Sequence, residues 1–78
     1  MKTYNVWMNE EDPEVFENHD EAFDTWHQMA NASNAGDTAY ICALDADGDY
    51  VEGSQRRLEN EDGNIFEYDE NGSRCWAE

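Results

Sequence analysis

Positive charge and aliphatic side chains are both scarce in this sequence. Its 78 residues include 4 Lys and Arg against 20 Asp and Glu, which gives a formal net charge of -16 at pH 7 and a pI near 4.1. This composition excludes a basic surface that binds nucleic acid, so we expect no direct nucleic-acid binding. Anionic membrane surfaces attract polybasic segments and would repel this chain, so we expect no membrane partner either.

Long apolar segments are absent and cysteines are few, which narrows the class of protein further. No run of 18 apolar residues is present, and a polar N-terminus with only Lys2 is unlike a signal peptide, so we expect a soluble, cytoplasmic protein. Two cysteines, Cys42 and Cys75, are fewer than a small disulfide scaffold carries, and a reduced pair is expected. The length predicts a single domain, residues 1–78.

Aromatic side chains compensate for the missing aliphatic ones. Leu, Ile, Val and Phe number only ten, which together with the net charge is typical of disordered chains. Three Trp and four Tyr favour folding, since each aromatic side chain buries about 150 to 250 Å². We therefore expect a small folded domain.

The first half of the chain predicts two strands and a helix. Thr3 to Met8 alternates between two faces, and Glu14 to Glu17 is expected to return beside it as a short strand. A helix is predicted from the capping residue Asn18 and ends by Ser33. Its apolar residues recur at helical spacing: Ala22, Phe23, Trp26, Met29 and Ala30.

The second half predicts strands joined by tight turns. Strands are expected over 38–44, 50–52, 65–68 and 73–76, separated by two Asp-Gly signals and one Asn-Gly signal, and the strand at 50–52 is expected to continue past a bulge at Gly53 to Leu58. The expected fold class is α+β: an antiparallel sheet of four to six strands, ending in a meander of hairpins, with one amphipathic helix packed on one face.

The acidic turn at residues 45–49 contains part of a calcium-binding pattern. Asp45, Asp47 and Asp49 offer carboxylates at alternate positions, as a hard cation prefers. The sixth position of such a loop is Tyr50 rather than Gly, and the twelfth is Arg56 rather than Glu. We therefore expect an ordinary acidic turn and no metal.

Neither zinc binding nor catalysis is indicated. His19 and His27 stand about two helical turns, or 12 Å, apart, too far to share one metal ion. The serines lie in turn-like surroundings without a nucleophile motif, and the five glycines form no phosphate cradle. Glycoside hydrolysis uses a pair of carboxylates, but a chain with twenty acidic residues contains such pairs at any separation, so their presence does not indicate this activity. We expect no enzyme and no cofactor.

The acidic residues are spread along the whole chain, and this arrangement lowers stability. Asp20 and Asp24 are one helical turn apart, and like charges at that spacing destabilise a helix by about 0.2 to 0.5 kcal/mol. Net charge of this size also opposes the compact state. An ordinary surface intersperses both signs, so the excess suggests a partner that requires it.

Mimicry of nucleic acid is one such requirement. Carboxylates two residues apart on a strand, or four apart on a helix, stand about 6 to 7 Å from each other, comparable with neighbouring phosphates. In size, charge and layout the chain resembles the small acidic inhibitors of phages and mobile elements: anti-CRISPR proteins, antirestriction proteins and the uracil-DNA glycosylase inhibitor. This resemblance implies a non-catalytic inhibitor that occupies the basic surface of a nucleic-acid-binding protein in the host cytoplasm.

Two alternatives remain open from the sequence. Proteins adapted to high salt are also acidic and poor in lysine, and at molar salt the Debye length falls to about 3 Å, which removes the repulsion. A generic acidic module for protein interaction is the other. The sequence does not indicate an oligomeric state.

The residues expected to contact a partner form two groups. Acids of the 45–52 turn come first, because a tight turn projects its side chains, and helix acids opposite the apolar stripe come second. Trp7 and Trp76 are possible contact anchors, with a place in the core as the alternative. The predicted contact residues are Asp45, Asp47, Asp49, Glu52, Asp20, Glu21 and Asp24.

Overall fold

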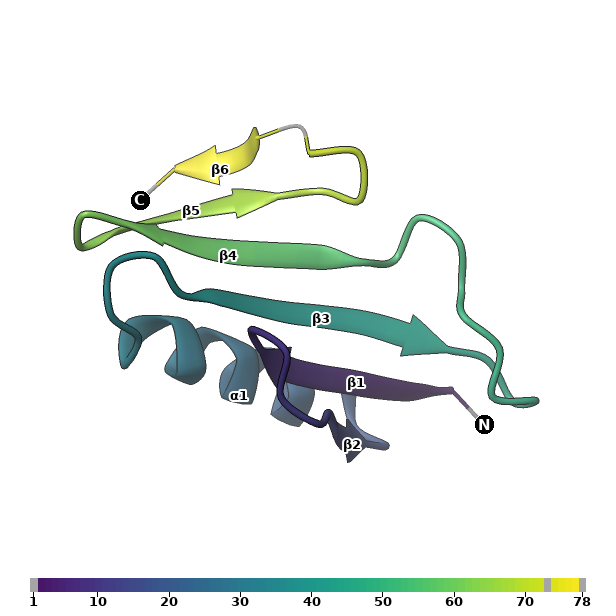
Figure 1. The fold of residues 1–78 in the computed structure, drawn as a ribbon. Helices are drawn as coiled ribbons and strands as arrows, with labels where there is room; N and C mark the ends of the chain where they lie inside the picture. Colours follow the sequence, from purple (N-terminus) through teal and green to yellow (C-terminus); the bar gives the residue numbers. More distant parts are fainter. Residues whose placement is uncertain (1, 73, 78) are drawn as a thin grey trace.

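The computed structural model describes residues 2–72 and 74–77, with side chains described as far as Gly72. One six-stranded antiparallel sheet carries a single helix on one face, which confirms the predicted α+β class (Figure 1). The elements are β1 (Thr3–Met8), β2 (Glu14–Phe16), α1 (His19–Asn31), β3 (Thr38–Leu44), β4 (Arg56–Glu61), β5 (Asn64–Tyr68) and β6 (Arg74–Ala77).

The strand order is β2-β1-β3-β4-β5-β6, so β3 to β6 form the expected C-terminal meander. Cys42 lies in β3 and Cys75 in β6, with two strands between them. Neighbouring strands are about 4.8 Å apart, so this order separates the two cysteines by more than the roughly 7 Å between Cα atoms that a disulfide tolerates. Cys42 is a free, buried thiol.

The helix begins where the sequence predicts. The Asn18 side chain accepts hydrogen bonds from the backbone N–H groups of Asp20 at 2.8 Å and Glu21 at 3.1 Å, which makes it the N-cap. The helix ends at Asn31, and Ala32 is its C-cap. The structure describes no helix that is long and apolar enough to cross a membrane, since α1 has 13 residues and a polar face.

The core lies between the helix and the central strands β1 and β3. Trp26 is fully buried there, and its indole N–H donates to the backbone carbonyl of Ala39 at 2.9 Å, so the largest core side chain leaves no unpaired donor. The buried apolar residues of this cluster are Val6, Ala22, Trp26, Ala30, Ala39, Ile41 and Leu58. In the part of the chain that the structure describes, the opposite face of the sheet carries no helix (Figure 1).

The connection between β3 and β4 is longer than predicted. A strand was expected from Tyr50 to Leu58, but β4 begins at Arg56, and Tyr50 makes only an isolated bridge to β3. A turn closes between Val51 and Ser54, where the N–H of Ser54 donates to the Val51 carbonyl at 3.1 Å. Gly53, which was expected to form a bulge within a strand, lies in this turn with a φ of +82°, a conformation that favours glycine.

Two smaller boundaries also differ. The short strand expected over Glu14 to Glu17 ends at Phe16. The last predicted strand, Ser73 to Trp76, is observed as β6 from Arg74 to Ala77. Ser73 and the side chain of Trp76 lie outside the described residues.

Candidate partner-binding surface

The turn that follows β3 holds the first predicted group of contact residues. Asp45 organises this turn, since its Oδ1 accepts hydrogen bonds from the N–H groups of Asp47 and Asp49, each at 3.0 Å. The backbone closes around it through the Asp45 N–H, which donates to the Asp49 carbonyl at 2.8 Å. All three aspartates and Glu52 are exposed. Asp45 therefore shapes the turn, whereas Asp47, Asp49 and Glu52 are available to a partner.

The three aspartates of this turn lie close together. One carboxylate oxygen from each falls within 4.8 Å of the others, and all three side chains are exposed. The rest of a calcium-loop ligand set is missing among the described residues: Tyr50 occupies the sixth position, and Arg56, in the twelfth, pairs with Glu67 at 2.9 Å. The three aspartates therefore concentrate negative charge at this turn.

The second predicted group lies on the first two turns of α1. Asp20, Glu21 and Asp24 are exposed, on the side of the helix opposite the buried residues Ala22 and Trp26. Negative charge in the first helical turn interacts favourably with the helix dipole, which partly offsets the repulsion between Asp20 and Asp24.

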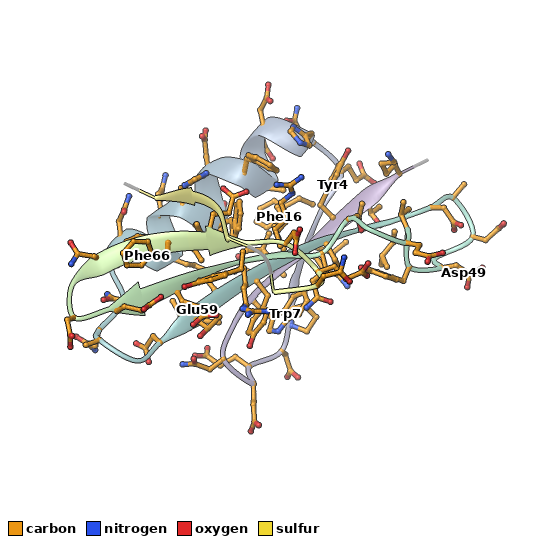
Figure 2. The ribbon with its side chains drawn as sticks, turned by 90° about the horizontal axis from the view of Figure 1, so that it is seen from above. Tyr4, Trp7, Phe16, Asp49, Glu59 and Phe66 are labelled. Atoms are coloured by element: carbon orange, nitrogen blue, oxygen red, sulfur yellow. The ribbon has the colours of Figure 1, made fainter. Side chains whose placement is uncertain are left out.

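Both groups lie at the same end of the sheet. Tyr4 links them, because its ring contacts His19 at the helix N-terminus, 5.3 Å between centroids, and its backbone pairs with Ala43, just before the acidic turn. In Figure 1 this is the end at which the chain terminus N lies, and the 45–55 connection projects beyond the helix there. Figure 2 shows Asp49 at the tip of that projection.

Few of the acidic side chains are neutralised. Among the described residues, salt bridges from arginine reach only Glu67, from Arg56, and Glu59, from Arg57, and all four of these side chains are at least partly buried. Fifteen other acidic residues are exposed: Glu10, Glu11, Asp12, Glu14, Glu17, Asp20, Glu21, Asp24, Asp45, Asp47, Asp49, Glu52, Glu61, Asp62 and Glu70. The exposed surface therefore keeps most of the negative charge of the sequence.

Sequence reasoning did not select the acidic residues at the other end of the sheet. The loop after β1 carries Glu10, Glu11 and Asp12, while Glu61 ends β4 and Asp62 follows it in the turn. The strand register brings these two segments to the same end, because Met8 pairs with β3 at Ala39, which in turn pairs with Leu58 of β4. Only the strand order, which the sequence does not give, places them together.

A hollow of about 350 Å³ lies on the helix side of the sheet, next to the N-terminal half of α1. Its walls include Tyr4, His19 and Phe23, and its charged groups include Lys2 and the Arg56–Glu67 pair. The Ser54 hydroxyl at its edge donates to the Val51 carbonyl at 2.6 Å and accepts from the Ala43 N–H at 3.0 Å. Both of these hydrogen bonds join the Ser54 hydroxyl to backbone groups, whereas a catalytic nucleophile is hydrogen-bonded to a general base.

The two histidines pack against aromatic rings. Phe23 lies between them, with ring centroids 4.4 Å from His19 and 6.0 Å from His27. His27 also contacts Trp26, with ring centroids 5.0 Å apart, so it borders the packed face of the helix.

Comparison with protein-family models, with curated proteins and with solved structures gives no match to this chain.

Proposed function

We propose that this chain is an acidic mimic of nucleic acid, which occupies the basic DNA- or RNA-binding surface of another protein and inhibits it without catalysis. In type it corresponds to the anti-CRISPR and antirestriction inhibitors that the sequence resembles. One observation carries the proposal: fifteen exposed acidic residues have no arginine partner among the described residues, while Arg56 and Arg57 are each paired with a glutamate.

The distribution of charge supports this function. A row of fixed carboxylates competes for lysine and arginine side chains in the way that phosphates do. Here the turn acids Asp47, Asp49 and Glu52 are exposed at the same end of the sheet as the helix acids. The sheet gives these groups fixed positions, because the strand that precedes the turn lies in the middle of the sheet.

A competition experiment tests the proposal. Immobilised protein is incubated with host lysate at low salt, and bound proteins are eluted either with duplex DNA or with salt. We expect it to retain basic nucleic-acid-binding proteins, which duplex DNA displaces and which leave the column as salt rises. Purified captured proteins are then assayed for nucleic-acid binding with and without the chain.

The contact site is tested with a matched pair of variants. Asp47→Lys with Asp49→Lys reverses two charges in the projecting turn and keeps the Asp45 carboxylate, which accepts the backbone hydrogen bonds of the turn. Glu14→Lys with Glu61→Lys changes the net charge equally at exposed positions outside the predicted group. We expect the turn variant to lose at least ten times more affinity than the control. Equal losses would locate the contact elsewhere, and the absence of any DNA-displaceable partner would leave the salt-adapted domain as the better reading.

A further inference from the structure

The helix-free face of the sheet carries a row of aromatic and arginine side chains. Trp7 of β1 pairs directly with Tyr40 of β3, Tyr40 with Arg57 of β4, and Arg57 with Tyr68 of β5. Directly paired residues of antiparallel strands place their side chains on the same face. Val6, next to Trp7 in the chain, is fully buried against the helix, so Trp7 lies on the opposite face.

The side chains of this row lie close enough to stack on one another. The rings of Trp7 and Tyr40 are stacked, 5.1 Å between centroids and 11° between planes. Farther along, the guanidinium carbon of Arg57 lies 5.0 Å from the centre of the Tyr68 ring. The protein therefore already holds one arginine against an aromatic ring of this row, and its other aromatic members form a pair of parallel rings.

Trp7 stands at the outer end of the row. β2 pairs only with Tyr4, Asn5 and Val6 of β1, so the row has no member in that edge strand. Trp7 is partly exposed, and Figure 2 shows it on the side of the sheet away from the helix. Part of the Trp7 side chain is therefore open to solvent.

The charge around Trp7 selects a cation. Two residues after Trp7 the chain enters the loop with Glu10, Glu11 and Asp12, all exposed. Asn9 fixes the start of this loop, because its Oδ1 accepts from the N–H of Thr38 at 3.0 Å. The segment that follows Trp7 in the chain is therefore acidic and exposed, which favours a cationic ligand over an anionic one.

The same charge argues against other occupants. A second copy of this chain adds another net charge of -16, and a single-stranded nucleic acid, which would also stack on aromatic rings, is repelled as well. We propose that the Trp7–Tyr40 pair is the docking site for an arginine side chain of a cationic protein partner, which extends the row formed by Arg57 and Tyr68. This proposal rests on the proposed function in one respect, namely that the partner is cationic.

Two peptides of equal charge test the proposal. Wild-type protein is titrated with octa-arginine and with octa-lysine, and dissociation constants are measured by calorimetry. Arginine stacks on aromatic rings better than lysine does, so we expect octa-arginine to bind about five- to tenfold more tightly. Trp7→Leu keeps an apolar side chain but removes the ring, and it should reduce this preference to the part that comes from bidentate pairing of arginine with carboxylates, whereas Trp7→Phe should retain most of it.

Two further variants serve as controls. Tyr50→Leu removes an exposed aromatic ring outside the row and should leave the preference for arginine unchanged. Asp47→Lys with Asp49→Lys should weaken both peptides by the same factor. Circular dichroism of each variant confirms the fold, and Trp7→Phe keeps the proposal testable if Trp7→Leu fails to fold.

The outcomes separate this proposal from the proposed function. If both peptides bind but wild type shows no preference, or if Trp7→Leu keeps the full preference, the docking site is wrong while the proposed function stands. If neither peptide binds the wild type, both fail. Binding of a single-stranded oligonucleotide that Trp7→Leu abolishes would overturn the assignment in favour of nucleic acid.

Discussion

Asp45 and its neighbours in the acidic turn have different roles, although the sequence presents them alike. The carboxylate of Asp45 accepts two backbone hydrogen bonds, whereas Asp47 and Asp49 contribute their backbone N–H groups to it and leave their own side chains exposed. Reversal of all three charges would thus alter the turn as well as the surface. The sequence placed the acids correctly in a turn, but hydrogen bonds within the turn decide which of them a partner can use.

Removal of the Asp45 carboxylate should loosen the turn. We expect Asp45→Ala to increase hydrogen exchange at the amides of Asp47 and Asp49 at least tenfold, because each loses its acceptor. Asp45→Asn retains an acceptor oxygen and should keep most of the protection. Unchanged exchange in Asp45→Ala would show that the backbone alone holds the turn.

Cys42 links burial to alkaline stability. Burial raises the pKa of the thiol above its ordinary value of 9.0, and this outweighs the opposite effect of the Asn5 backbone N–H. A group whose pKa is higher in the folded state contributes stability below its unfolded pKa and loses that contribution as the pH rises through the folded value. The folded protein should therefore weaken above about pH 9 as the thiol ionises.

Urea denaturation of wild type and Cys42→Ala at a series of pH values measures this effect. The alanine variant lacks the thiol and should be less stable near neutral pH through lost packing. We expect the difference between the two proteins to shrink above pH 9, because only the wild type has Cys42 to ionise. A difference that stays constant to pH 11 would contradict the account.

At the scale of elements, local patterns predicted the helix and the first strands well. Thr3–Met8 and Thr38–Leu44 are observed with their predicted bounds, although Ile41, Cys42 and Ala43 in β3 are buried in succession, and Asn18 caps the helix as expected. The start of β4 was predicted too early because Tyr50 and Val51 favour a strand, while the turn that ends at Ser54 depends on hydrogen bonds to β3 and Val51. The bond from the Ala43 N–H to Ser54 joins residues eleven apart, and a contact at that separation has no local sequence pattern.

Asp24→Lys should stabilise α1. The substitution removes the like-charge pair with Asp20 and adds an attractive pair at the same spacing, so the free energy of unfolding should rise by about 0.5 kcal/mol. Urea denaturation at low salt measures the gain, and Asp24→Asn, which only removes the repulsion, should give about half of it. The same lysine should weaken binding of a cationic partner. Equal or lower stability of Asp24→Lys would show that the helix acids do not repel one another appreciably.

At the scale of the whole molecule, the charge is left on the surface and is not neutralised by internal pairing. The net charge was evident from composition, but its arrangement was not. The strand order brings Glu10–Asp12 and Glu61–Asp62 to one end, and the pairing of β1, β3, β4 and β5 aligns Trp7, Tyr40, Arg57 and Tyr68. Alternation predicted that Trp7 lies opposite Val6, yet the row appears only when strand neighbours are known.

Added salt should stabilise the fold. Between about 0.1 M and 1 M salt the Debye length falls from about 10 Å to about 3 Å, which screens repulsion among the exposed carboxylates. We expect the melting temperature in sodium chloride to rise across this range, and to rise less in Asp47→Lys with Asp49→Lys. A melting temperature that falls or stays constant would mean that self-repulsion is not a major term in stability. Nucleic-acid mimicry and salt adaptation both predict the rise, so a binding measurement must distinguish them.

Competition with duplex DNA is that measurement. A basic nucleic-acid-binding protein captured from host lysate is titrated with this chain in the presence of labelled duplex, at several salt concentrations. The account predicts that the chain displaces the duplex, that its affinity falls with salt, and that Asp47→Lys with Asp49→Lys weakens the displacement far more than Glu14→Lys with Glu61→Lys. If the chain and the duplex bind the captured protein simultaneously, with no effect on each other's affinity, the mimic account is contradicted.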